Sequence, residues 1–93
     1  MNNDKQEIYA IMMERLINHF RKRTDVQNID IMNLTGFCRN CLSKWYFEAA
    51  KAKNINISYE DAKEVIYGMP YSEWKDKYQL EATKEQKEQF NKK

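Results

Sequence analysis

Glycine and proline are almost absent from this chain, and their scarcity constrains its fold more than any other feature. The 93 residues include two glycines and one proline, which are Gly36, Gly68 and Pro70. Turn-rich all-β folds depend on these residue types at their tight turns, and collagen-like or linker-like chains need far more of them. The chain is therefore expected to be mostly helical.

Hydrophobic periodicity locates the first three helices. A helix over roughly residues 4–23 is predicted by apolar side chains at helical spacing, which are Tyr9, Met12, Met13, Leu16, Ile17 and Phe20. The run Thr24–Gln27 fits a capping box and predicts a short second helix that begins at once and ends before Gly36. The third helix, over residues 38–52, has the strongest pattern, with an apolar stripe of Cys38, Cys41, Leu42, Trp45, Ala49 and Ala52.

The second half of the chain contains three shorter helical patterns. A fourth helix is expected to open at Ser58 and to end at Gly68, since Pro70 prevents its continuation. Aromatic residues at i, i+3 and i+7 predict a fifth helix over residues 71–78. A capping box at Thr83–Gln86 predicts a terminal helix.

These patterns predict one compact all-α domain over residues 1–93, built from five to six short helices in an orthogonal assembly. The core is expected over about residues 4–82, with helices one and three as the central packing pair and a peripheral C-terminal helix at about 83–92. Residues 26–47 are mostly apolar with only three charges, so the core and any site are expected there. The Met12–Met13 pair is expected to fill the core, and the aromatic residues of 67–78 to close its bottom.

Charge and hydropathy exclude several classes of function. The formal net charge is +2 and is spread thinly along the chain, which argues against nucleic-acid binding. The longest uncharged stretch, residues 31–38, is too short to span a bilayer. The amino-terminal run MNNDKQE lacks the features of a secretory signal, so a cytoplasmic location with reduced thiols is expected.

Two motifs carry a resemblance to a known family. The run from Asp25 to Tyr46, DVQNIDIMNLTGFCRNCLSKWY, and the run from Ile66 to Lys75, IYGMPYSEWK, are long and distinctive. Together they resemble short bacterial proteins of the domain-of-unknown-function 1244 family, over most of the chain. The resemblance implies a compact, all-helical bacterial domain and implies no reaction.

The pair Cys38 and Cys41 is the most obvious chemical motif, and three interpretations remain open. The thiols could be inert core residues, because free cysteine is among the most buried residue types. They could form a redox pair, although no βαβ pattern surrounds them. With His19, the only histidine, they could ligate a transition metal such as zinc, with Asp25 or Asp30 as a fourth ligand or in an outer shell.

Polar residues of the second helix form a further candidate cluster. Asp30 and Asn33 share a side of the helix with apolar residues, so they need polar partners if that side is buried. Arg39 or Arg15 could supply them. A structural network of Asp30, Asn33 and Arg39 that joins helices two and three is favoured over a catalytic acid.

Two classes of function follow. A non-catalytic interaction or regulatory module is favoured, because the sequence shows no set of catalytic residues that can be expected to lie together. A homodimer would increase the buried area of so small a domain. The alternative is a metal- or thiol-dependent enzyme, or a metal-binding protein, that uses His19, Cys38 and Cys41. No cofactor is otherwise implied, and the activity, substrate and partner are not encoded in any motif.

Overall fold

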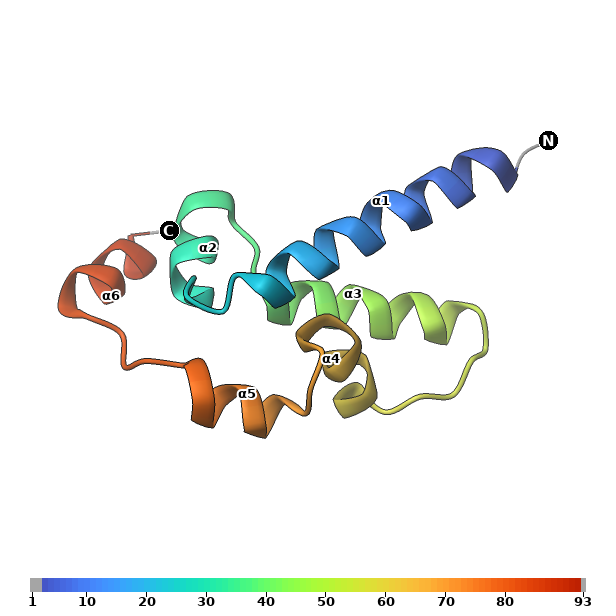
Figure 1. The fold of residues 1–93 in the computed structure, drawn as a ribbon. Helices are drawn as coiled ribbons and strands as arrows, with labels where there is room; N and C mark the ends of the chain where they lie inside the picture. Colours follow the sequence, from blue (N-terminus) through green and yellow to red (C-terminus); the bar gives the residue numbers. More distant parts are fainter. Residues whose placement is uncertain (1–2, 93) are drawn as a thin grey trace.

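The computed structural model describes residues 3–92 and confirms an all-α fold in one small domain (Figure 1). Six helices follow one another without a strand in this part of the chain. They are α1 (Asn3–Lys22), α2 (Asn28–Thr35), α3 (Arg39–Ala52), α4 (Tyr59–Tyr67), α5 (Tyr71–Tyr78) and α6 (Lys84–Asn91). Within residues 3–92, no helix combines the length and apolar character needed to cross a membrane.

Local sequence signals set most helix ends. At α4, Ser58 and Asp61 form a capping box, and Gly68 ends the helix in the left-handed conformation with φ 79°. At α6, Thr83 and Gln86 form the second predicted capping box. These capping signals involve only four or five neighbouring residues, so they set the end of a helix whatever the helix packs against.

The capping box predicted at the start of α2 is wrong. The helix begins at Asn28, and the preceding residue, Gln27, is its N-cap without a side-chain capping bond. The Gln27 amide is engaged elsewhere, since Nε2 donates to the Tyr78 carbonyl at 2.9 Å and Oε1 accepts from the Leu80 amide at 2.9 Å. A long-range contact therefore outweighed the local signal.

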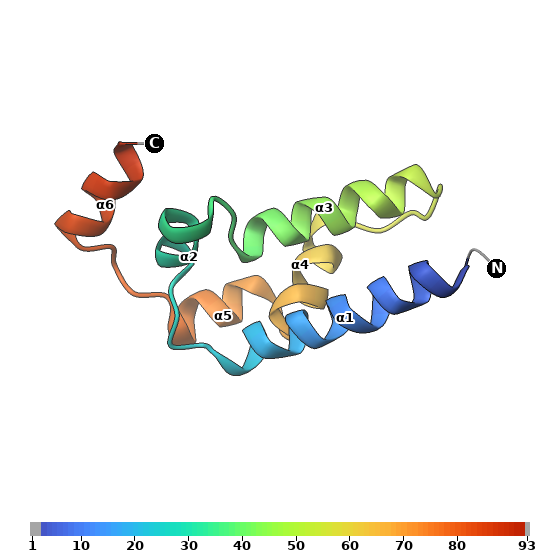
Figure 2. The same ribbon diagram turned by 90° about the horizontal axis from the view of Figure 1, so that it is seen from above.

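Helix α4 is the centre of the fold and packs against α1, α3 and α5. Figure 2 shows α4 between α1 and α3, so the expectation that helices one and three form the central pair is wrong. The buried core comprises Leu42, Ile66, Tyr67 and Trp74. Helix α1 has no buried residue and reaches this core through partly buried side chains, among them Ile17 and Phe20.

Aromatic residues near Pro70 close the core, as predicted. Tyr67 contacts Tyr71 and Trp74, with ring centroids 5.1 and 5.0 Å apart. Leu42 is the one member of the core cluster that lies within residues 26–47, but Ile31 and Cys38 are buried there too, with the polar residues Gln27, Asn33, Arg39 and Ser43. The expectation of a core in this region is therefore correct in part.

The molecule is elongated, with principal extents of 50 × 24 × 23 Å. The N-terminal half of α1 diverges from α3 in Figure 1, and the start of this projection extends past the end of α3 in Figure 2. Met12 and Met13, which were expected to fill the core, are 59% and 41% exposed on this projection. At the other end of the molecule, α6 packs against α2.

Candidate functional site

The two cysteines lie side by side at the start of α3. Cys38 is the N-cap residue and is buried, while Cys41 is partly buried, and both are free thiols. Burial raises the pKa of the Cys38 thiol, and the backbone amides of Cys41 and Asn40 offset this only in part. A reactive cysteine needs a depressed pKa, so this environment opposes a nucleophilic or redox role for Cys38.

The other residues of the predicted metal site are not gathered around these thiols. His19 is exposed on α1, Asp25 pairs with the Arg23 guanidinium at 3.0 Å, and Asp30 accepts a hydrogen bond from Gln86. The hydrogen bond from Arg23 holds the pKa of Asp25 below its usual value. Among residues 3–92, no group of three or more His, Cys, Asp or Glu side chains could hold a metal ion.

Arg39 is a buried cation that ties the α1–α2 turn to the core. Its side chain donates to the carbonyls of Arg23 and Val26, both at 2.8 Å, and to Asn28 Oδ1 at 2.9 Å. The guanidinium also lies 4.9 Å from the centroid of the Trp74 ring. Burial lowers the pKa of Arg39. These contacts assign Arg39 a structural role, with a different set of partners from the predicted Asp30 and Asn33.

The polar residues of α2 contact α6 rather than α3. Gln86 Nε2 donates to Asp30 Oδ1 at 2.8 Å, and Asn33 Nδ2 donates to the Gln86 carbonyl at 3.2 Å. Asp30 and Asn33 thus both bond to Gln86, which the sequence predicted only as a helix-capping residue. Gln86 reaches Asp30 and Asn33 only because α6 packs against α2, and no local sequence pattern predicts that packing.

A hydrogen-bonded tyrosine was also missed by sequence reasoning. The Tyr67 hydroxyl donates to Asn40 Oδ1 at 2.6 Å and accepts from Asn28 Nδ2 at 3.0 Å. Burial strongly raises the pKa of Tyr67. The available signal was that a buried tyrosine needs a hydrogen-bond partner for its hydroxyl, and Asn28 and Asn40 lie in the apolar region that was expected to be the core.

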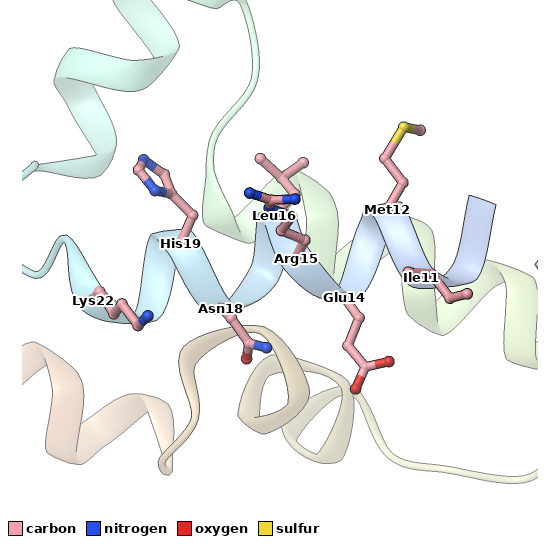
Figure 3. A pocket seen from close by; sticks show the side chains of 8 residues that line it. All are labelled: Ile11, Met12, Glu14, Arg15, Leu16, Asn18, His19 and Lys22. Carbon is pink, nitrogen blue, oxygen red and sulfur yellow. The ribbon is translucent and has the colours of Figure 1, made fainter. Parts of the chain in front are cut away.

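One side of α1 carries a row of side chains, all exposed except the partly buried Leu16, which we call the α1 stripe. Its members follow each other at spacings of three or four and so share one side of the helix; they are Lys5, Tyr9, Met12, Leu16, His19 and Arg23. Figure 3 shows Met12, Leu16 and His19 projecting to one side of α1, whereas Glu14 and Asn18 project to the other. The residues drawn there line a hollow of about 780 Å³ and all belong to α1, so this hollow is open helix surface.

The α1 stripe runs into an apolar cavity between α1 and α2, which we call the α1–α2 pocket. Its volume is about 250 Å³, and its lining residues are His19, Phe20, Arg23, Val26, Ile31, Leu34, Thr35 and Phe37. His19 and Arg23 belong to both features. Phe37 stacks on Trp45, with ring centroids 6.0 Å apart, so Trp45 lies close enough to respond when this pocket is filled.

Cations border these apolar groups. The Lys5 ammonium lies 5.6 Å from the centroid of the Tyr9 ring, and Arg15 projects to the same side as Leu16 (Figure 3). Neither Lys5 nor Arg15 forms an ion pair within residues 3–92, whereas Arg23 is paired with Asp25. The surface therefore combines apolar anchoring groups with two unpaired positive charges.

Comparison with known proteins gives a family match. A family model described as "Protein of unknown function (DUF1244)" matches residues 26–92, a span that includes α2 to α6. No match was found among the curated proteins.

Proposed function

The chain belongs to the DUF1244 family of proteins of unknown function, and we propose that it is a non-catalytic interaction module. It binds a helix of a partner protein along the α1 stripe, with an apolar side chain of the partner in the α1–α2 pocket. Both cysteines are free thiols, which supports a reducing compartment such as the cytoplasm.

The exposure of the N-terminal half of α1 carries this proposal. Tyr9 and Met12 of the α1 stripe are 53% and 59% exposed, and Ile8, at i−4 from Met12, is 62% exposed. Contiguous apolar surface of this kind marks interaction sites in soluble proteins. Anchors at spacings of three and four, beside a small apolar pocket, are the features by which one helix recognises another.

The chemistry of the buried groups also supports a non-catalytic role. Burial raises the pKa of both Cys38 and Tyr67, so neither offers a thiolate or a phenolate at neutral pH. The Tyr67 hydroxyl is engaged by Asn28 and Asn40. General acid–base catalysis works best with groups whose pKa lies near the operating pH.

A neutral helical peptide tests the proposed function. We would titrate the protein with an amphipathic peptide of about 18 residues, ~27 Å long as a helix, with Leu at the anchor spacings and Gln elsewhere. Binding is expected to change Trp45 fluorescence, because Trp45 stacks on Phe37 of the pocket. Met12→Ser should weaken binding about tenfold, because it removes one apolar anchor.

Ile55→Ser is the matched control, since Ile55 is 54% exposed but lies outside the α1 stripe and the α1–α2 pocket. This variant should bind the peptide like the unmodified protein. No binding at peptide concentrations of about 1 mM, or equal losses in the two variants, would overturn the proposed function.

A further inference from the structure

Resting on the proposed function, we propose that the helix bound by the α1 stripe is acidic. Its apolar residues cover Tyr9, Met12 and Leu16, one of them enters the α1–α2 pocket, and its carboxylates face Lys5 and Arg15. The partner is thus an acidic amphipathic segment of another protein.

The distribution of charge around α1 supports an acidic partner. Lys5 and Arg15 are exposed and have no ion-pair partner among the described residues. The carboxylate of Glu14 projects to the opposite side of the helix (Figure 3), and Glu7 lies on that side too, at i−7 from Glu14. A docked helix therefore meets cations and apolar groups on this side of α1.

The same charges disfavour a second copy of the chain as the occupant. Two α1 helices that cross antiparallel at Met12 would set Lys5 of one copy against His19 of the other, and Tyr9 against Arg15. In that arrangement neither Lys5 nor Arg15 would face a carboxylate of the other copy. Carboxylates on a different partner would complement both cations, and such complementarity favours association.

The size and lining of the α1–α2 pocket indicate which side chain of the partner it can hold. Its volume of about 250 Å³ is below the range of roughly 300–1,000 Å³ that is usual for small-molecule sites. The ring of Phe20 and the side chains of Val26 and Ile31 make it apolar, so it suits a single large apolar side chain. Such buried anchors supply most of the affinity of an interface.

Three peptides of equal length test the acid preference. They share the Leu anchors and carry Glu, Gln or Lys at the remaining positions, and their affinities are measured at low ionic strength. The Glu peptide should bind about fivefold more tightly than the Gln peptide, as two exposed ion pairs would give, and the Lys peptide should bind most weakly. Added salt should reduce the advantage of the Glu peptide.

A charge reversal tests the assignment to Arg15. Arg15→Glu should remove most of the advantage of the Glu peptide over the Gln peptide. Lys75→Glu, a reversal on the exposed side of α5, should leave all three affinities unchanged. Both substitutions change the net charge equally, so a general effect of charge would show in both variants.

The outcomes separate this inference from the proposed function. If the three peptides bind alike, the acid preference is overturned and helix docking is kept. If none of them binds, the proposed function fails as well. If the protein forms a dimer in which the α1 stripe is protected from hydrogen exchange, a second copy occupies the site and the acidic partner is ruled out.

Discussion

Among single residues, Arg39 makes the most consequential set of contacts. It is 1% exposed, donates three hydrogen bonds to the α1–α2 turn and stacks against Trp74. We expect Arg39→Ala to lower the free energy of unfolding by about 3–5 kcal/mol, because it leaves a cavity and buried acceptors without donors. Arg39→Lys keeps the charge but loses the planar fork, so it should cost about 2 kcal/mol. Urea denaturation measures both, and a loss below about 1 kcal/mol for the alanine variant would contradict this role.

The raised pKa of Tyr67 predicts how the free energy of unfolding depends on pH. Burial raises its pKa above the ordinary value of 10.0, so the folded chain keeps a proton that the unfolded chain releases. The stabilisation is complete below pH 10 and declines above it, by about 1.4 kcal/mol for each pH unit. Tyr67→Phe should reduce the alkaline loss in urea denaturation and leave the part that the raised pKa of Cys38 contributes, at the expense of the bonds to Asn28 and Asn40. The exposed control Tyr46→Phe should retain it, and an equal alkaline loss in both variants would refute the prediction.

At the scale of helices, Gly36 and Gly68 provide a matched pair of C-terminal caps. Their φ angles are 84° and 79°, which residues other than glycine rarely adopt. A Cβ at Gly36 would meet nothing within 4 Å, whereas one at Gly68 would lie 3.0 Å from the Arg21 side chain, which donates a hydrogen bond to the Val65 carbonyl. Gly36→Ala should therefore cost about 1 kcal/mol and Gly68→Ala about 2 kcal/mol. Thermal denaturation compares the two, and equal losses would show that the Arg21 contact is unimportant.

Features of the helices that depend on neighbouring residues could be predicted from the sequence, whereas features that depend on distant residues could not. The ends of α4 at Ser58 and Gly68 were predictable because caps involve neighbouring residues only. The orientation of α3 was not, since Trp45 of its apolar stripe is 52% exposed while Arg39 and Ser43 are buried. Burying polar groups requires partners far along the chain, and a periodicity cannot reveal them. The candidate site was missed for the related reason that apolar spacing on α1 indicates a buried side without saying what covers it.

Helix α6 should be held in place largely by Gln86. Its side chain completes the capping box with Thr83 and donates to Asp30 at 2.8 Å. Gln86→Ala removes both interactions, at about 1–2 kcal/mol, so amides of α6 should exchange faster with solvent while those of α4 stay protected. Gln89→Ala, on the same helix and exposed, is the control. Accelerated exchange throughout the molecule would instead indicate that α6 is part of the central cooperative unit.

At the scale of the whole molecule, stability should fall along the long axis from α4 toward the projecting end of α1. The fold is 50 Å long, but its buried apolar residues all lie between Ile31 and Trp74, and α1 contributes none of them. Elements with few buried contacts open independently of global unfolding. A helical segment shorter than about 12–15 residues is marginally stable in water without tertiary contacts, which applies to the first half of α1.

Hydrogen exchange tests this gradient and connects it with binding. In the free protein, amides of residues 7–12 should exchange much faster than those of α4, because Ile8, Ile11 and Met12 have no covering partner within the described chain. Adding the acidic helical peptide should slow exchange in residues 7–12 and leave α4 unchanged, since covering the α1 stripe stabilises only the element that binds. The Met12→Ser variant should show the fast exchange of the free protein and little added protection. Strong protection of residues 7–12 in the free protein at micromolar concentration would mean that a second copy already covers this helix.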